Sequence, residues 1–314
     1  MEKIIEAEGL KKHFGKVKAV DGINLSVEKG ELFGFLGVNG AGKSTTINML
    51  CTLFLPTEGT ARICGYDLVR DAEKIKRKIG IVYQNNCLDE RLSVKENLLI
   101  WSSLYGLSGR QQKERLTEIC GILDLNDILK RRFGKLSGGQ KRRCEIAKAL
   151  MHRPEILFLD EPTTGLDPAT RKSVWETVER LRKDMDMTVF LTTHYMEEAA
   201  RATTIAIIDG GRLKETGTPF TLKERYASDK LHLIPKAGKE NVLAARLADQ
   251  KIVYDQREER LIIKLENSMN ALPILDGLND DIVGFEVVQG TMDDVFLHAT
   301  GKSASEEPSD VNVS

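Results

Sequence analysis

The sequence predicts an α/β fold over the first two thirds of the chain and a smaller α+β unit behind it. Leu32–Leu36 is a short apolar run typical of a buried parallel strand, and a glycine-rich loop and a helical pattern follow it. Beyond Pro219, four strand-like runs alternate with helical ones. We therefore expect two domains, residues 1–220 and 221–300, and a disordered polar tail over 301–314.

The first domain carries two further kinds of pattern. Asn24–Val27 alternates polar and apolar residues, and Glu28–Gly30 has the composition of a turn, so the start of the chain is expected to be β-rich. Thr45–Phe54 places apolar residues at helical spacing, and the segment of about 85–150 is helical as well. These patterns predict a mixed sheet with an N-terminal antiparallel part and a helical insertion.

The second domain is expected to have a ferredoxin-like order of elements, β-α-β-β-α-β, with one more helix at its end. The predicted strands are Leu231–Ile234, Lys251–Tyr254, Leu261–Leu265 and Ile282–Val288, and the predicted helices are Val242–Leu247, Met269–Leu278 and Met292–Ala299. Residues 221–314 hold 11 Lys and Arg against 17 Asp and Glu, so this part of the chain is acidic.

The composition excludes several classes of protein. The net charge is only −1, which gives no general attraction to polyanions. The five cysteines form no C-x-x-C pair, and their number is odd, so a zinc site or a disulfide framework is not expected. No stretch approaches the ~18 apolar residues that a membrane helix needs, and no signal-peptide core is present. We expect a chain in the reducing cytosol that does not itself cross a membrane.

The strongest motif is Gly37–Thr45, which matches the phosphate-binding pattern G-x-x-x-x-G-K-[ST]. Its glycines let backbone N–H groups converge on a phosphate, and the helix behind it directs its positive N-terminal end to the same point. Lys43 is expected to pair with the β- and γ-phosphates of ATP, and Ser44 to hold Mg²⁺. The predicted ATP-binding residues of this loop are Gly37, Asn39, Gly40, Gly42, Lys43, Ser44 and Thr45.

Functional side chains also follow two other predicted strands. Ile156–Leu159 leads into Asp160 and Glu161, and Thr188–Thr193 leads into His194. Open α/β sheets bind their ligands at the carboxyl ends of the strands. We therefore expect Asp160 to hold Mg²⁺ through water, Glu161 to polarise the attacking water as a general base, and His194 to bond to the γ-phosphate.

A second phosphate site is predicted at the start of a later helix. Leu136–Gln140 combines a serine, two glycines and a helix N-terminus, and the helix continues through Cys144 and Leu150. Two phosphate sites with one set of metal-binding carboxylates indicate a head-to-tail homodimer. The predicted residues of the second site are Ser137, Gly138, Gly139 and Gln140.

Over about residues 3–220, this set of motifs resembles the ATP-binding subunits of ABC transporters. Leu136–Gln140 matches the signature sequence of that family without change, and His194 matches its switch histidine. The resemblance implies a P-loop fold of ABC type and hydrolysis of ATP with Mg²⁺. It also implies a dimer joined to a separate transmembrane permease, which holds the chain at the cytoplasmic side of the cell membrane.

The resemblance implies roles for three more residues. Gln84 is similar to the family's Q-loop glutamine, which contacts Mg²⁺ and the attacking water and couples to the membrane subunit. Asp167, in Gly165-Leu166-Asp167, resembles the D-loop residue at the dimer interface. Phe14 falls where the family places an aromatic ring, usually tyrosine, that stacks on adenine; packing in the core is the alternative.

A closer resemblance is to the daunorubicin-resistance type of ATP-binding subunit. Leu92–Leu98 is similar to that group's segment after the Q-loop, and Thr291–Leu297 is similar to its C-terminal motif. This resemblance implies export, with a cargo that the permease selects.

The alternative function is a soluble ABC ATPase that acts on nucleic acid or ribosomes. Such proteins usually carry a second ATPase domain, a long coiled-coil insertion or paired cysteines, and this sequence has none of them. The acidic second domain lacks the aromatic strand that stacks bases in RNA-binding sheets. The basic clusters near residues 74–78 and 131–143 are not interleaved with aromatics, so we expect solvated helix faces and no nucleic-acid partner.

Overall fold

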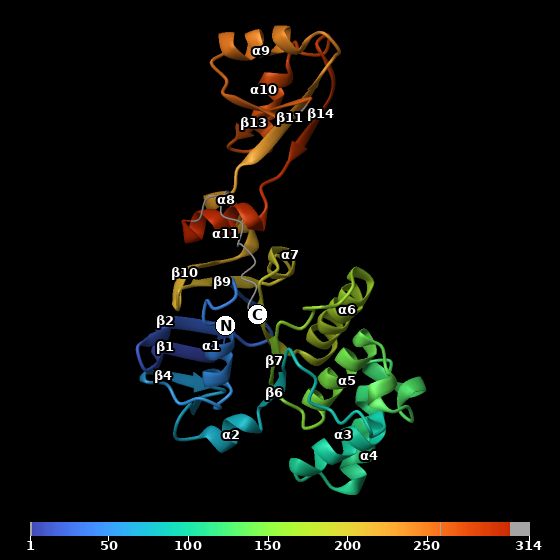
Figure 1. The fold of residues 1–314 in the computed structure, drawn as a ribbon. Coiled ribbons are helices and arrows are strands. Elements are labelled where there is room, and N and C mark those ends of the chain that lie inside the picture. The colour runs from blue at the N-terminus through green and yellow to red at the C-terminus, as the bar shows by residue number, and fades with distance from the viewer. Residues whose placement is uncertain (1, 258, 302–314) are drawn as a thin grey trace, which may run out of the picture. The chain divides into compact units, whose positions relative to one another are not determined.

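The computed structural model describes residues 2–257 and 259–301, which belong to two compact units, Met1–Thr216 and Gly217–Ser314 (Figure 1). The predicted tail lies outside the described residues from 302 onward. The division falls a few residues before the predicted boundary, because a helix that starts at Pro219 packs within the second unit. In the described part of the chain, none of the helices combines the length and the apolar character needed to span a membrane.

The first unit opens with an antiparallel sheet in the strand order β2-β1-β4-β5. Its strands are β1 (Lys3–Phe14), β2 (Val17–Glu28), β4 (Glu58–Ile63) and β5 (Tyr66–Asp67). In β2 the buried residues Ile23, Leu25 and Val27 alternate with more exposed ones, as the alternation in the sequence predicts for a sheet with one face on the core. The predicted N-terminal antiparallel part is therefore confirmed.

The second sheet of this unit has six strands in the order β10-β9-β3-β8-β7-β6. They are β3 (Leu32–Leu36), β6 (Ile79–Val82), β7 (Ile156–Asp160), β8 (Thr188–Thr193), β9 (Thr204–Asp209) and β10 (Arg212–Gly217). The strands from β9 to β6 are parallel, and every residue of β3, β7 and β8 is buried. Parallel strands covered on both faces are mostly apolar, which explains the apolar runs Leu32–Leu36, Ile156–Leu159 and Val189–Leu191.

Helix α1 (Lys43–Leu50) joins the two sheets through a shared apolar core. On β8, the ring centroid of Phe190 lies 5.2 Å from that of Phe33 on β3 and 5.3 Å from that of Phe158 on β7. The predicted bounds Thr45–Phe54 are wrong at both ends of this helix. The observed helix begins at Lys43, within the phosphate-loop motif, and ends at Leu50. It ends early because Thr52 takes a left-handed conformation, with φ of 62°, that stops the helical hydrogen bonding.

The predicted helical insertion lies beside β6 and β7 (Figure 1). It consists of α3 (Val94–Leu104), α4 (Gly109–Ile122), two 3₁₀ turns (Asn126–Ile128 and Phe133–Lys135) and α5 (Gly138–Leu150). Ser93, Ser108 and Ser137 each cap one of these helices in a capping box, so the start of each helix is encoded locally. The remaining helices of the unit are α2 (Ala72–Lys76), α6 (Pro168–Met185) and α7 (Met196–Ala199).

The second unit is an antiparallel sheet in the order β12-β13-β11-β14 with its own apolar core. Its elements are α8 (Pro219–Tyr226), β11 (Asp229–Pro235), α9 (Glu240–Asp249), β12 (Tyr254–Arg257), β13 (Arg260–Leu265), a 3₁₀ turn (Ser268–Asn270), α10 (Ala271–Leu275), β14 (Ile282–Val288) and α11 (Met292–Thr300). This is the predicted ferredoxin-like order.

Two predicted boundaries of the second unit are wrong. The strand predicted over Lys251–Tyr254 begins only at Tyr254, because Lys251 has a left-handed φ of 58° and its N–H bonds back to α9. The helix predicted over Met269–Leu278 splits into a 3₁₀ turn and a short α10. Helix α8 was not predicted at all, although Thr218 and Pro219 form a capped helix start.

Candidate active site

The site lies where parallel strands of the six-stranded sheet end side by side. β3 leads into Gly37, β7 ends at Asp160, and β8 is followed by His194. β8 lies between β3 and β7, so the residues behind all three strands meet at one edge. The carboxyl edge of such a sheet is where ligands bind, and the residues predicted from the strand ends are brought together there.

The phosphate loop depends on two glycines for its close packing. A Cβ atom on Gly37 would lie 2.6 Å from the carbonyl oxygen of Ile208, and one on Gly42 would lie 2.5 Å from that of Ala19. Gly42 also has a φ of 110°, which a side chain would disfavour. The loop therefore packs against β9 and β2 at positions where only glycine fits, and α1 starts directly behind it.

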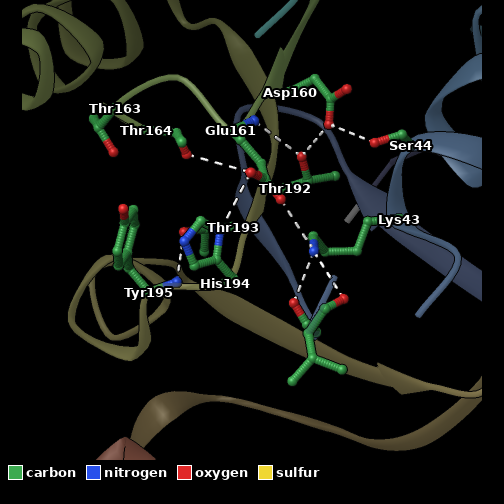
Figure 2. A network of polar contacts seen from close by, with 12 residues as sticks. Lys43, Ser44, Asp160, Glu161, Thr163, Thr164, Thr192, Thr193, His194 and Tyr195 are labelled. Atoms are coloured by element: carbon green, nitrogen blue, oxygen red, sulfur yellow. Dashed lines mark hydrogen bonds and ion pairs between the residues drawn. The ribbon is translucent and has the colours of Figure 1, made fainter. Parts of the chain in front are cut away.

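The ammonium of Lys43 is buried within this loop. Its Nζ donates to the carbonyl oxygens of Gly37, at 2.8 Å, and Val38, at 3.1 Å, and lies 3.1 Å from Oε1 of Glu161 (Figure 2). A buried cation needs such oxygen partners to offset its desolvation. The side chain is thus held at the centre of the site, and the carboxylate of Glu161 balances its charge.

The carboxylate of Glu161 lies between two nitrogen-bearing side chains. Its Oε2 lies 3.2 Å from Nδ1 of His194, on the side away from Lys43, and accepts a hydrogen bond from Thr164 Oγ1 at 3.3 Å. Burial raises the pKa of the Glu161 carboxyl, but Lys43 and then His194 outweigh this effect and hold the pKa below its usual range. Glu161 is therefore an ionised acceptor.

Asp160 and Ser44 together fit a magnesium ion. Ser44 Oγ lies 3.4 Å from Oδ1 of Asp160, and Thr192 Oγ1 donates to the same oxygen at 2.6 Å (Figure 2). A carboxylate and a hydroxyl are the hard oxygen ligands that Mg²⁺ prefers, and Mg²⁺ is usually held by one or two carboxylates, water and the phosphates of the substrate. The donor set matches that requirement.

These residues surround a cleft of about 420 Å³. Its lining includes six of the seven phosphate-loop residues predicted to bind ATP, together with Gln84 from the segment behind β6. The lining residues are Ala19, Asn39, Gly40, Gly42, Lys43, Ser44, Thr45, Gln84, Glu161, Thr164 and His194. Gly37 is buried beneath the loop, and Asp160 lies below Ser44.

The predicted second phosphate site does not line this cleft. Ser137 caps α5, with its Oγ accepting from the backbone N–H of Gln140, and Asp167 caps α6 in the same way through Thr170. Gly138, Gly139 and Gln140 form the first turn of α5. A Cβ on Gly139 would lie 2.7 Å from a methyl group of Thr170, so the two helix starts are packed closely together. One chain therefore presents two separate nucleotide-type motifs.

Phe14 also lies outside the lining of the cleft. Its ring is about half exposed, at 47%, and contacts the ring of Phe54 edge-on, with centroids 5.7 Å apart. Packing in the core, the alternative for this residue, is therefore wrong. The exposed face leaves the adenine-stacking role as a prediction, and the Lys12 ammonium 5.2 Å from the ring centroid adds a positive charge there.

Several residues of the site were missed by the sequence analysis. Thr192 bonds to Asp160 and also accepts from the Glu161 backbone N–H at 3.1 Å. Glu198, fully enclosed on α7, accepts from the hydroxyls of Thr163 and Thr193, which flank the loops of Glu161 and His194. No local pattern marks these residues, because Thr192 is 32 positions from Asp160 and Glu198 is 35 positions from Thr163.

Comparison with known proteins agrees with this geometry. The family model described as ABC transporter matches residues 20–164. The structure of the dimeric cassette MJ0796 in a post-hydrolysis state, bound to ADP and Pi, is 28% identical with a TM-score of 0.61 and covers 68% of this chain and 98% of that one. CbiO1 from Clostridium perfringens is 25% identical with a TM-score of 0.67, covering 79% and 96%.

Two relatives match over nearly the whole length. The daunorubicin/doxorubicin resistance ATP-binding protein DrrA of Streptomyces peucetius is 39% identical over 96% of this chain and 94% of its own. The linearmycin resistance ATP-binding protein LnrL of Bacillus subtilis (strain 168) is 36% identical, over 96% and 99%. The chain belongs to the ATP-binding proteins of ABC transporters, and it is an ATPase of that type. The predicted resemblance to the daunorubicin-resistance group is confirmed.

Proposed function

We propose that this chain is the motor subunit of an exporter and that it works as a head-to-tail homodimer on a separate permease. The observation that carries the proposal is the separation of its two nucleotide motifs. Lys43, Glu161 and His194 surround one cleft, and Ser137 lies outside it. A second copy in the opposite orientation supplies the missing signature motif to each cleft, which a C₂ dimer does twice.

The residues of the cleft divide the chemistry between them. Phosphate oxygens replace Glu161 as the partner of Lys43, and this exchange frees the carboxylate to accept a proton from the attacking water. His194 lies beside the same carboxylate and bonds to the γ-phosphate, and Gln84 orients the water. Ser44 and Asp160 hold Mg²⁺, which neutralises charge on the phosphates when bound.

Export through a membrane partner is supported by the relatives. Both full-length relatives are resistance proteins by name, toward daunorubicin and doxorubicin in one case and linearmycin in the other. The described helices do not span a membrane, and in this proposal a permease supplies the path for the cargo. The chain then sits at the cytoplasmic face of the membrane through that partner.

Replacing the general base tests the proposal directly. Glu161→Gln removes the proton acceptor and keeps the phosphate contacts, so the variant should bind ATP and remain as an ATP-bound dimer in size-exclusion chromatography. Hydrolysis should fall by about 10²- to 10⁴-fold. Lys43→Ala is the matched comparison, and it should weaken ATP binding itself. Undiminished steady-state hydrolysis by Glu161→Gln would show that the base is assigned wrongly.

A further inference from the structure

The segment that carries Gln84 is fastened to α5 on its upstream side. Arg142, on the second turn of that helix, is almost fully buried and donates through one guanidinium nitrogen to the carbonyl oxygen of Tyr83, the residue before Gln84. Its other terminal nitrogen lies 3.4 Å from the carbonyl oxygen of Asp160. One side chain thus joins the helix, the start of the Gln84 loop and the end of β7.

The same helix fastens the loop on its downstream side. Glu145 is fully buried, and its Oε1 accepts the backbone N–H groups of Cys87 and Leu88 at 2.6 and 2.9 Å. A carboxylate that accepts two backbone donors makes strong, charge-assisted hydrogen bonds. The exposed residues between the two attachments are Gln84, Asn85 and Asn86.

The second carboxylate oxygen of Glu145 has a different partner. Oε2 lies 2.9 Å from Nζ of Lys148, one turn further along α5, and that ammonium lies 5.0 Å from the centroid of the Trp101 ring on α3. The charge of Glu145 is thereby balanced within the helical insertion. Its Oε1 remains directed at the loop, so the two oxygens have separate tasks.

We infer that Arg142 and Glu145 are positioning residues for Gln84. They attach the loop to α5 on both sides of Gln84 and so fix where Gln84 enters the cleft. The inference rests on the proposed function, in which Gln84 orients the attacking water.

A pair of double variants isolates the contact to the loop. Glu145→Gln/Lys148→Met keeps an amide oxygen that can accept from Cys87 and Leu88, whereas Glu145→Leu/Lys148→Met has no acceptor. Both variants remove the ion pair without leaving a buried charge unpaired, and replacement of a buried ion pair by uncharged residues of similar volume is well tolerated. They differ in the side chain at position 145, where glutamine offers an acceptor to the loop and leucine offers none.

Two measurements on the full-length protein are compared between these variants. Amide hydrogen exchange at Cys87 and Leu88 should be faster in the Leu variant than in the Gln variant. The kcat for ATP should fall by about 10- to 100-fold in the Leu variant alone, while the Kd for ATP stays within about threefold in both. A loss of packing alone would lower kcat in both variants and would change the Kd for ATP as well.

The inference is overturned if kcat is equal in the two variants although amide exchange is faster in the Leu variant. It is also overturned if the amides of Cys87 and Leu88 exchange at the same rate in both variants. Gln84→Ala is measured beside them and should lower kcat without changing the Kd for ATP. If Gln84→Ala leaves kcat unchanged, the role proposed for Gln84 is wrong and its positioning has no catalytic effect, whatever the exchange shows.

Discussion

Glu161 adopts a backbone conformation that few residues other than glycine adopt. Its φ is 45°, and its N–H is held by both the carbonyl and the hydroxyl oxygen of Thr192, at 3.2 and 3.1 Å. A strained residue that its surroundings hold so firmly is typical of a functional site. Here the conformation turns the carboxylate from the end of β7 toward Lys43 and His194.

Thr192 should matter for the metal more than for the nucleotide. Thr192→Val keeps the shape of a buried strand residue and removes the hydroxyl that orients Asp160 and supports Glu161. Loss of a group that orients a metal ligand costs about 10- to 100-fold in metal affinity or activity, so the Mg²⁺ concentration for half-maximal hydrolysis should rise by that factor. Titration of hydrolysis with Mg²⁺ measures it.

Thr192→Ser is the control for that titration, because it restores the hydroxyl and removes only a methyl group. It should behave nearly as the unchanged protein does. An unchanged Mg²⁺ requirement in Thr192→Val would mean that Asp160 does not depend on this hydrogen bond or does not hold the metal.

At the scale of elements, the sequence predicts best what is determined locally. Strands β3, β7 and β8 each contain an apolar run because both faces are covered, and α5 starts directly after Ser137 because Ser137 and Gln140 complete a capping box. The early end of α1 at Leu50 was missed, because Thr52 gives no composition signal for its left-handed conformation.

The candidate site divides in the same way. Asp160, Glu161 and His194 could be predicted because each directly follows a recognisable strand, and the order of parallel strands brings their ends together. Arg142 and Glu145 could not, because the backbone groups of the site that they contact lie 18 to 59 positions away in the sequence, and Glu198 could not, because it joins Thr193 to Thr163, 35 positions away from it.

His152, two residues after the end of α5, makes the free energy of unfolding depend on pH. Its ring stacks on Tyr105, with centroids 3.8 Å apart, and its Nε2 lies 2.9 Å from the carbonyl oxygen of Ile79. Burial lowers the pKa of His152 from 6.5 to about 4. The unfolded chain therefore binds more protons than the folded one between these values, and stability falls as the pH falls through this range.

The expected size of this effect is about 2 kcal/mol between roughly pH 7 and pH 5. His152→Phe keeps an aromatic ring beside Tyr105 and cannot take up a proton, so it should lose that much less stability over the same interval. Thermal unfolding of the full chain and of the variant at both pH values measures the difference. Parallel losses in the two proteins would show that His152 is not protonated on unfolding in this range.

At the scale of the whole molecule, the second unit has its own core, and none of its described residues lines the nucleotide cleft. We expect it to act by contact, either by stabilising the homodimer or by adjusting how the motor meets its permease. A passive role in folding is the alternative.

Truncation after Thr216 separates these roles. The truncated chain should still bind ATP, because every residue that lines the cleft is retained, and it should lose dimer stability or permease-coupled transport. Size-exclusion chromatography with Glu161→Gln in both lengths gives the dimer fraction. If dimerisation, permease binding and transport all stay unchanged, the second unit is passive. If a folded truncated chain no longer binds ATP, the boundary between the two units is assigned wrongly.

Mixing two inactive variants tests whether each nucleotide site combines the phosphate loop of one copy with the signature motif of the other. Lys43→Ala spoils the phosphate loop and Ser137→Arg spoils the signature motif. In a mixed head-to-tail dimer both defects fall in one site, and the other site is intact. Neither variant alone should hydrolyse ATP, and an equal mixture should recover about a quarter of the normal rate, because half the dimers are mixed and each has one good site of two.

A mixture of Lys43→Ala with the unchanged protein shows whether dimers with one intact site are active. If they are, and the two inactive variants show no recovery on mixing, or if Ser137→Arg alone hydrolyses ATP normally, the head-to-tail model is contradicted.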